Sequence, residues 1–173
     1  MSNYKEKLSQ IQLFCFDVDG VFTDNIVYLL SDGEQARTAN VRDGYAVQHA
    51  IKKGIQIAII SGGKSEAVRK RFEMLGVKEI MLGSSHKMSV YEALLQRLHV
   101  SDDEVCYMGD DIPDMPVMQR VGLPCCPADA SPEVKAISKY VSPFNGGAGC
   151  VRDVLEQALK LRGLWLDADA HIW

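Results

Sequence analysis

The chain has 173 residues, which suits one folded domain with a sizeable core and leaves little room for two. Its hydrophobic fraction of 47% and its charged fraction of 24% are ordinary for a globular protein in water. A net charge of −4 argues against nucleic acids and anionic membranes as general partners, but it leaves open small anions that need only local positive charge. We therefore predict a single domain over residues 1–173.

Short apolar strands alternate with amphipathic helices along the chain. The first strand is expected at 12–16, followed by a β-hairpin over Ile26–Val41 around an Asp-Gly turn signal. Apolar spacing then predicts a helix that ends at Gly54. Further strands are expected at 55–60, 79–83, 104–109 and 123–127, and further helices at 64–75, 87–98, 113–120, 131–138 and 151–162. This alternation predicts an α/β fold with a doubly wound parallel sheet.

The cysteines and the termini bear on where the protein resides. Five cysteines, an odd number without a C-x-x-C pair, favour reduced thiols over disulfides or a zinc site. The N-terminal segment has no apolar signal region, and no run approaches 18 apolar residues, so we expect neither export nor a membrane span. The prediction is a cytoplasmic protein.

Polar clusters follow four of the predicted strands. They are Asp17 with Asp19, Ser61-Gly62-Gly63-Lys64, Lys87, and Gly109-Asp110-Asp111 with Asp114. Ligands of such sheets bind outside the carboxyl ends of the strands, so we expect these clusters at one rim. Asp, Ser and Gly also favour turns, and each cluster alone could be an ordinary loop. Four of them at strand ends favour a common site.

Two carboxylates two positions apart raise a question of charge. Asp17 and Asp19 would face the same way if the strand continued, and two close like charges beside a buried strand are costly unless a cation lies between them. Carboxylate oxygens suit Mg²⁺, with Asp17 and Asp110 as the natural ligands. The pattern predicts a magnesium-assisted phosphoryl site.

The stretches "DVDGVFTD", "ISGGK", Lys87 and "GDDIPD" resemble, in order, the four motifs of the haloacid dehalogenase superfamily. The resemblance implies a Rossmann-like sheet of that type, with Asp17 as the nucleophile that forms an aspartyl-phosphate. It implies that Asp19 is the general acid and then the general base. Ser61 and Lys87 would hold the transferring phosphoryl group.

The same resemblance implies a set of metal ligands. Mg²⁺ would be bound by Asp17, the backbone carbonyl of Asp19, and Asp110, with Asp111 and Asp114 as supporting residues. An acid two positions after the nucleophile is typical of the superfamily's phosphatases. The short stretch that follows it leaves no room for a large cap domain, so a member without a cap is expected.

Three further segments narrow the resemblance: the hairpin, "NVRDGYA" (40–46) and "FNGGAGCVRD" (144–153). Together they are similar to 3-deoxy-D-manno-octulosonate 8-phosphate phosphatases. This implies a phosphomonoesterase of lipopolysaccharide precursor synthesis that acts on a sugar-acid phosphate. It also implies a homo-tetramer in which projecting hairpins pair and a neighbour's segments help to cover the active site.

Five residues are candidates for substrate binding. Arg42 suits the sugar carboxylate because a guanidinium fork matches a carboxylate with two hydrogen bonds. Asp43, Gly62, Gly63 and Lys64 complete the set. In the competing interpretation Asp43 is the N-cap of the following helix, Gly63 supplies a tight turn, and Lys64 is a solvated helix charge.

Two other functions stay open at this point. One is a phosphatase for nine-carbon keto-deoxy sugar acid 9-phosphates. Phosphatases of that kind tend to carry a glutamate at the position of Gly63. The other is a non-enzymatic receiver-like phospho-acceptor domain, against which Asp19 and the Ser61 segment argue.

In the tail at 163–173, Trp165 and Trp173 are costly to expose, so we expect the tail to dock on the domain or on a neighbour.

Overall fold

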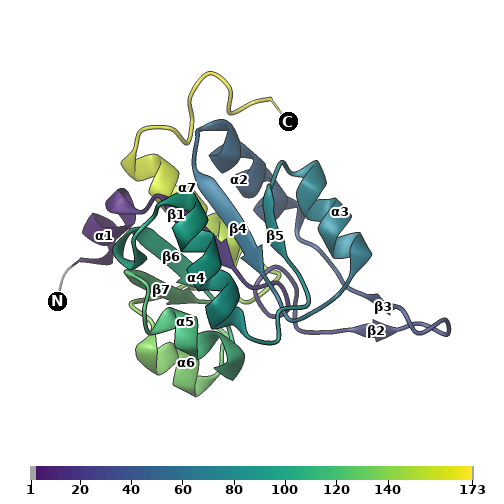
Figure 1. The fold of residues 1–173 in the computed structure, drawn as a ribbon. Helices are drawn as coiled ribbons and strands as arrows, with labels where there is room; N and C mark the ends of the chain where they lie inside the picture. The colour runs from purple at the N-terminus through teal and green to yellow at the C-terminus, as the bar shows by residue number, and fades with distance from the viewer. Residues whose placement is uncertain (1–2, 173) are drawn as a thin grey trace.

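A parallel β-sheet forms the middle layer of the molecule, and helices cover both of its faces (Figure 1). The structure is a computed structural model that describes residues 3–172. Within them the sheet has six strands in the order β5-β4-β1-β6-β7-β8. The strands are β1 (Leu13–Phe16), β4 (Gln56–Ile60), β5 (Glu79–Met81), β6 (Val105–Met108), β7 (Leu123–Cys126) and β8 (Tyr140–Val141). The predicted fold class is confirmed.

The helices fall into two layers. They are α1 (Tyr4–Gln10), α2 (Val41–Lys52), α3 (Glu66–Met74), α4 (Lys87–Leu98), α5 (Met115–Met118), α6 (Pro132–Ile137) and α7 (Cys150–Leu161). Those named in the sequence prediction lie within a few residues of their expected bounds, except that 113–120 divides into a 3-10 turn (Ile112–Asp114) and the short α5. The sequence did not predict α1 and β8.

Alternate residues of the central strand serve two separate cores. Phe14 and Phe16 pack in one core with apolar side chains of α1, α2, α3 and α7. Leu13 and Cys15 pack in the other with side chains of α4, α5 and α6. Because β1 is buried on both faces, it is apolar throughout, as expected for a strand inside a parallel sheet.

The register of the sheet brings the ends of three strands together. Phe16 of β1 lies between Ile59 of β4 and Met108 of β6. The ladder continues one residue further, where the backbone N–H of Asp17 donates to the Met108 carbonyl at 3.0 Å. The segments that follow β1, β4 and β6 therefore leave the sheet side by side.

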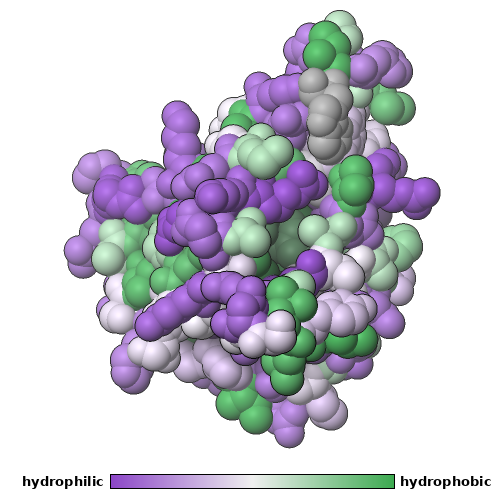
Figure 2. Space-filling view, turned by 90° about the vertical axis from the view of Figure 1, so that its right-hand side faces the viewer, coloured by the Kyte–Doolittle hydropathy of each residue, from purple (hydrophilic) through white to green (hydrophobic). Residues whose placement is uncertain are grey.

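The predicted hairpin projects from the sheet as a separate two-stranded ribbon (Figure 1). Its paired strands are short, β2 (Tyr28–Leu29) and β3 (Gln35–Ala36). Hydrophobic residues reach the surface among hydrophilic ones on the side from which it projects (Figure 2). The ribbon also exposes large apolar side chains, with Leu29 80% exposed and Tyr28 53% exposed.

The C-terminal tail docks on the domain, as the sequence predicts for Trp165. The Trp165 ring is buried against Tyr45 and His49 of α2, and the Arg152 guanidinium lies 5.1 Å from its centroid. Lys53 at the end of α2 forms ion pairs with two aspartates of the tail. Trp173 lies outside the described residues. No helix within residues 3–172 is long and apolar enough to cross a membrane.

Asp43 belongs to the packing of α2 on α7. Asn40 is the N-cap of α2, since its side chain accepts from the backbone N–H of Arg42 at 2.8 Å, so the expectation that Asp43 caps this helix is wrong. The fully buried Asp43 carboxylate instead accepts from the backbone N–H of Arg152 at 2.7 Å, in the first turn of α7. Gly149, the N-cap of α7, has no side chain that could do this.

We expect Asp43→Ala to lower the free energy of unfolding by about 1–3 kcal/mol, because it leaves buried donors of α7 without an acceptor. Asp43→Asn keeps a neutral acceptor and should cost less, since burial raises the pKa of Asp43 to about 6 and already disfavours its charge. Urea unfolding of the two variants checks this. An alanine variant as stable as the parent protein would contradict the capping role.

Candidate active site

Nine of the predicted site residues line one pocket of about 230 Å³ at the carboxyl ends of the strands. They are Asp17, Asp19, Ser61, Gly62, Gly63, Lys87, Asp110, Asp111 and Asp114. Asn25 and Pro113 complete the lining. The expectation that four polar clusters meet at one rim is therefore met in the folded chain.

Lys87 places a fixed positive charge in the floor of this pocket. It is the first residue of α4, and its ammonium group lies 2.9 Å from Asp17 Oδ1 and 2.7 Å from Asp114 Oδ1. Burial lowers the pKa of Lys87, but the two carboxylates outweigh this effect and the net shift is upward. Lys87 therefore stays charged and can neutralise an anionic group bound beside Asp17.

Asp114 orients its neighbours. Its Oδ1 also accepts from the Tyr107 hydroxyl at 2.7 Å, and its Oδ2 accepts from the backbone N–H of Asp110 at 3.2 Å. A Cβ on Gly109 would overlap this carboxylate, so only glycine lets the chain pass so close. Because both oxygens of Asp114 are engaged, its geometry suits a supporting role better than that of a metal ligand.

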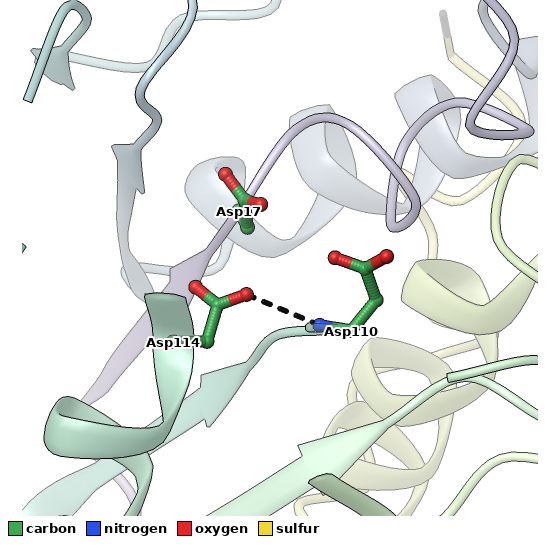
Figure 3. Close-up of side chains that lie close together, drawn as sticks. All are labelled: Asp17, Asp110 and Asp114. Atoms are coloured by element: carbon green, nitrogen blue, oxygen red, sulfur yellow. Dashed lines mark hydrogen bonds between the residues drawn. The ribbon is translucent and has the colours of Figure 1, made fainter. Parts of the chain in front are cut away.

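The buried carboxylates of this pocket form a group that suits a divalent cation. Asp17, Asp110 and Asp114 point toward one space, and their oxygens lie within 4.8 Å of one another (Figure 3). Burial, with repulsion from Asp114, raises the pKa of Asp17 to about 7; burial also raises the pKa of Asp110 to about 6. The side-chain amide of Asn25 holds Asp110 Oδ2 at 2.8 Å. An oxygen-binding cation would offset this concentration of charge, with Asp17 and Asp110 as its side-chain ligands.

Ser61 lies in a loop that is tied to the neighbouring strand. Its hydroxyl accepts from the backbone N–H of Gly63 at 3.2 Å, and its carbonyl accepts from Ser84, beyond β5. The Gly63 carbonyl accepts from Gly83 at 2.8 Å. These bonds fix a short loop of small residues beside Lys87, where backbone and hydroxyl groups can contact phosphoryl oxygens.

Asp19 has a partner that sequence reasoning missed. Arg37, the residue after β3, holds both of its oxygens, with Nε 2.6 Å from Oδ1 and Nη2 3.1 Å from Oδ2. No local pattern identifies this pair, because 18 residues and a hairpin separate its members. Asn25 was missed as well, although it directly follows the first motif.

Three of the predicted substrate-binding residues do not reach the pocket. Arg42 lies on the exposed side of α2 and lines a different cavity, with Phe144 and residues of α7. The expectation that Asp43 contacts substrate is not met, because its carboxylate is buried against α7. The aliphatic part of Lys64 lies on Gly83. Gly62 and Gly63 are the substrate-binding candidates that line the pocket.

The pKa of Asp17 is about 7 in the folded protein, whereas an unfolded aspartate has a pKa of about 4. Without metal, protonated Asp17 therefore favours the folded state at low pH, and this contribution to stability is lost as the pH rises from about 4 to about 7. Asp17→Asn should therefore raise the melting temperature in EDTA at about pH 8, and much less at about pH 5. Mg²⁺ should stabilise the parent protein more at the higher pH, since protons compete with the metal. Thermal unfolding checks both; an effect of Mg²⁺ that is independent of pH would contradict the site.

Comparisons with known proteins agree with this geometry. Residues 76–155 match the model of a family described as haloacid dehalogenase-like hydrolase. The chain is 39% identical over 157 residues to the 3-deoxy-D-manno-octulosonate 8-phosphate phosphatase KdsC of Escherichia coli strain K12, covering 91% of this chain and 84% of the relative.

Solved structures of related phosphatases have the same fold. A phosphatase of the same name from Yersinia pestis has a TM-score of 0.89 at 36% identity, covering 92% of this chain and 86% of that chain. One from Moraxella catarrhalis, in complex with magnesium ion, phosphate ion and KDO, has a TM-score of 0.89 at 32% identity, covering 93% and 92%. The chain belongs to the haloacid dehalogenase superfamily and, within it, to the family of 3-deoxy-D-manno-octulosonate 8-phosphate phosphatases.

Proposed function

We propose that the protein is a Mg²⁺-dependent phosphatase that hydrolyses 3-deoxy-D-manno-octulosonate 8-phosphate to the free sugar acid and phosphate, in lipopolysaccharide precursor synthesis. The observation that carries this proposal is the position of Lys87 between Asp17 and Asp114, with Asp110 facing them across the same pocket. Such an arrangement can hold a phosphoryl group next to a carboxylate nucleophile. The family membership supplies the substrate.

The reaction proceeds in two steps at this site. Asp17 attacks phosphorus, the bond to the sugar oxygen breaks, and that oxygen takes a proton from Asp19. Asp19 then removes a proton from water as the water oxygen attacks phosphorus, which releases phosphate and frees Asp17. Ser61 and Lys87 hold the phosphoryl oxygens throughout. Asp17, the backbone carbonyl of Asp19 and Asp110 would hold Mg²⁺, which would supply further charge neutralisation to the phosphoryl group.

The choice of sugar acid is the second part of this proposal. Gly63 lines the pocket without offering an acceptor for the polyol of a nine-carbon acid. A nine-carbon keto-deoxy acid 9-phosphate is therefore the second candidate substrate, with the same chemistry. A receiver-like phospho-acceptor, which would hold phosphate without repeated turnover, is disfavoured by the family membership.

We predict that kcat/KM for the eight-carbon substrate exceeds that for nine-carbon acids by at least tenfold, about 1.4 kcal/mol. Phosphate release from both substrates measures this. Gly63→Glu should narrow the preference, mainly by harming the eight-carbon substrate, and Asp17→Asn should remove release from both. Faster turnover of nine-carbon acid phosphates would favour the second candidate, and the absence of repeated turnover would contradict the proposed phosphatase.

Three further features belong to the proposal. Residues 1–173 form one hydrolase domain. A cytoplasmic location fits the five buried, free cysteines. The assembly is a homo-tetramer in which hairpins pair, since the two-stranded ribbon leaves backbone edges and apolar side chains in water.

The tetramer is tested at Leu29, which is 80% exposed on the hairpin. Leu29→Glu should dissociate the assembly because a carboxylate is costly to bury where hairpins pair. Leu166→Glu is the matched control, since Leu166 is 79% exposed in the tail, and this variant should keep the parent mass. Light scattering measures both variants. A fully active monomeric parent protein would contradict the proposal.

A further inference from the structure

Arg37 closes the pocket on the side of the hairpin. Its guanidinium group forms two parallel hydrogen bonds to Asp19, at 2.6 Å and 3.1 Å. The Arg37 side chain is only 10% exposed, whereas that of Asp19 is 33% exposed. A paired geometry of this kind fixes direction as well as distance, which distinguishes it from an ordinary surface ion pair.

The guanidinium group is itself held in place. Arg37 Nη1 donates to the Gln35 carbonyl at 3.2 Å, and Nη2 lies 3.3 Å from the Gln35 side-chain oxygen. Both anchors belong to β3, so the base of the hairpin sets where the charge lies. Together with its two bonds to Asp19, Arg37 makes four polar contacts, so its side chain is held in one conformation before substrate binds.

Arg37 also lies next to the phosphoryl-binding loop. A Cβ built on Gly63 would be 3.6 Å from each of Arg37 Nη2, Asp19 Oδ2 and Ser61 Oγ. The guanidinium group, the acid and the loop therefore meet at one glycine. Of the described residues, Arg37 is the basic side chain paired with Asp19.

We propose that Arg37 is a positioning residue, which aims the Asp19 carboxylate at the bridging oxygen of the substrate. The inference rests on the proposed function, because it presumes that Asp19 protonates the leaving group. Arg37 touches neither phosphorus nor the attacking water in this account. It acts through Asp19.

The proton balance defines how the pair must work. Without substrate, both oxygens of Asp19 accept from Arg37. To act as the acid, Asp19 must turn one oxygen to the substrate, and the proton on that oxygen passes to the leaving alcohol as the P–O bond breaks. The second oxygen of Asp19 keeps its hydrogen bond to Arg37, which maintains the orientation of the carboxylate. Asp19 then regains a proton from the attacking water.

The test uses substituted phenyl phosphates of similar size, because a poor leaving group needs protonation and p-nitrophenolate does not. Arg37→Met should lower kcat/KM about tenfold to a hundredfold for phenyl phosphate, and less than about threefold for p-nitrophenyl phosphate. The dependence of log kcat/KM on leaving-group pKa should become steeper. Arg37→Lys, which keeps the charge but lacks the planar pair of donors, should recover part of the loss.

Two further variants separate the possible outcomes. Asp19→Asn should steepen the dependence as well, and adding Arg37→Met to it should cause little further loss. Arg97→Met is the matched control and should leave the series unchanged, because Arg97 forms the same two-bond pair with Glu79 away from the pocket.

The inference is overturned if Arg37→Met lowers kcat/KM equally across the series while Asp19→Asn steepens it. That result would make Arg37 a binding or packing residue and leave the proposed function intact. If Asp19→Asn keeps the parent dependence, the acid role of Asp19 fails, and the inference falls with it. A parent protein that releases no phosphate from any substrate would overturn the proposed function.

Discussion

The ion pairs of Lys87 with Asp17 and Asp114 are the interaction on which the rest of the site depends. Three carboxylates gather in a buried space at the ends of β1 and β6, and a single buried ammonium group lies against two of them. Burying unpaired charge costs several kcal/mol per ion, so the ionised cluster is favoured when positive charge lies beside it. Lys87 supplies part of the positive charge, and the carboxylate charge that it does not balance favours binding of a divalent metal ion. Once Lys87 and a divalent metal ion are both present, their positive charge can also attract a phosphoryl group.

The sheet explains why these groups meet. β1, β4 and β6 are apolar on both faces, so their ends are fixed by two cores, and the segments after them start from a rigid frame. Close backbone approaches refine the positions, as at Gly109 against Asp114. The exposed parts of the site are held differently. Asp19 depends on Arg37, and thus on a hairpin that has little support of its own, so the acid is coupled to whatever fixes the hairpin.

Much of this was predictable from the sequence, for physical reasons. Strand ends carry the polar clusters, and parallel topology alone brings Asp17, Ser61, Lys87 and Asp110 to one rim. What could not be predicted depends on pairings without sequence spacing. The Arg37–Asp19 pair spans a hairpin, and the role of Asp43 as an acceptor for α7 requires knowing that α2 and α7 pack together. The short β8 and α1 carry too weak a periodicity to be read alone.

We propose that Asp17 receives the phosphoryl group beside the positive charges of Lys87 and Mg²⁺. The most direct measurement is a crystal structure of the protein with Mg²⁺ and beryllium fluoride, which mimics a phosphoryl group bonded to a carboxylate. We expect beryllium bonded to a carboxylate oxygen of Asp17, fluorines in contact with Ser61 and Lys87, and Mg²⁺ between the adduct and Asp110. An adduct on Asp19, Asp110 or Asp114, or a pocket that binds Mg²⁺ but no beryllium fluoride, would contradict it.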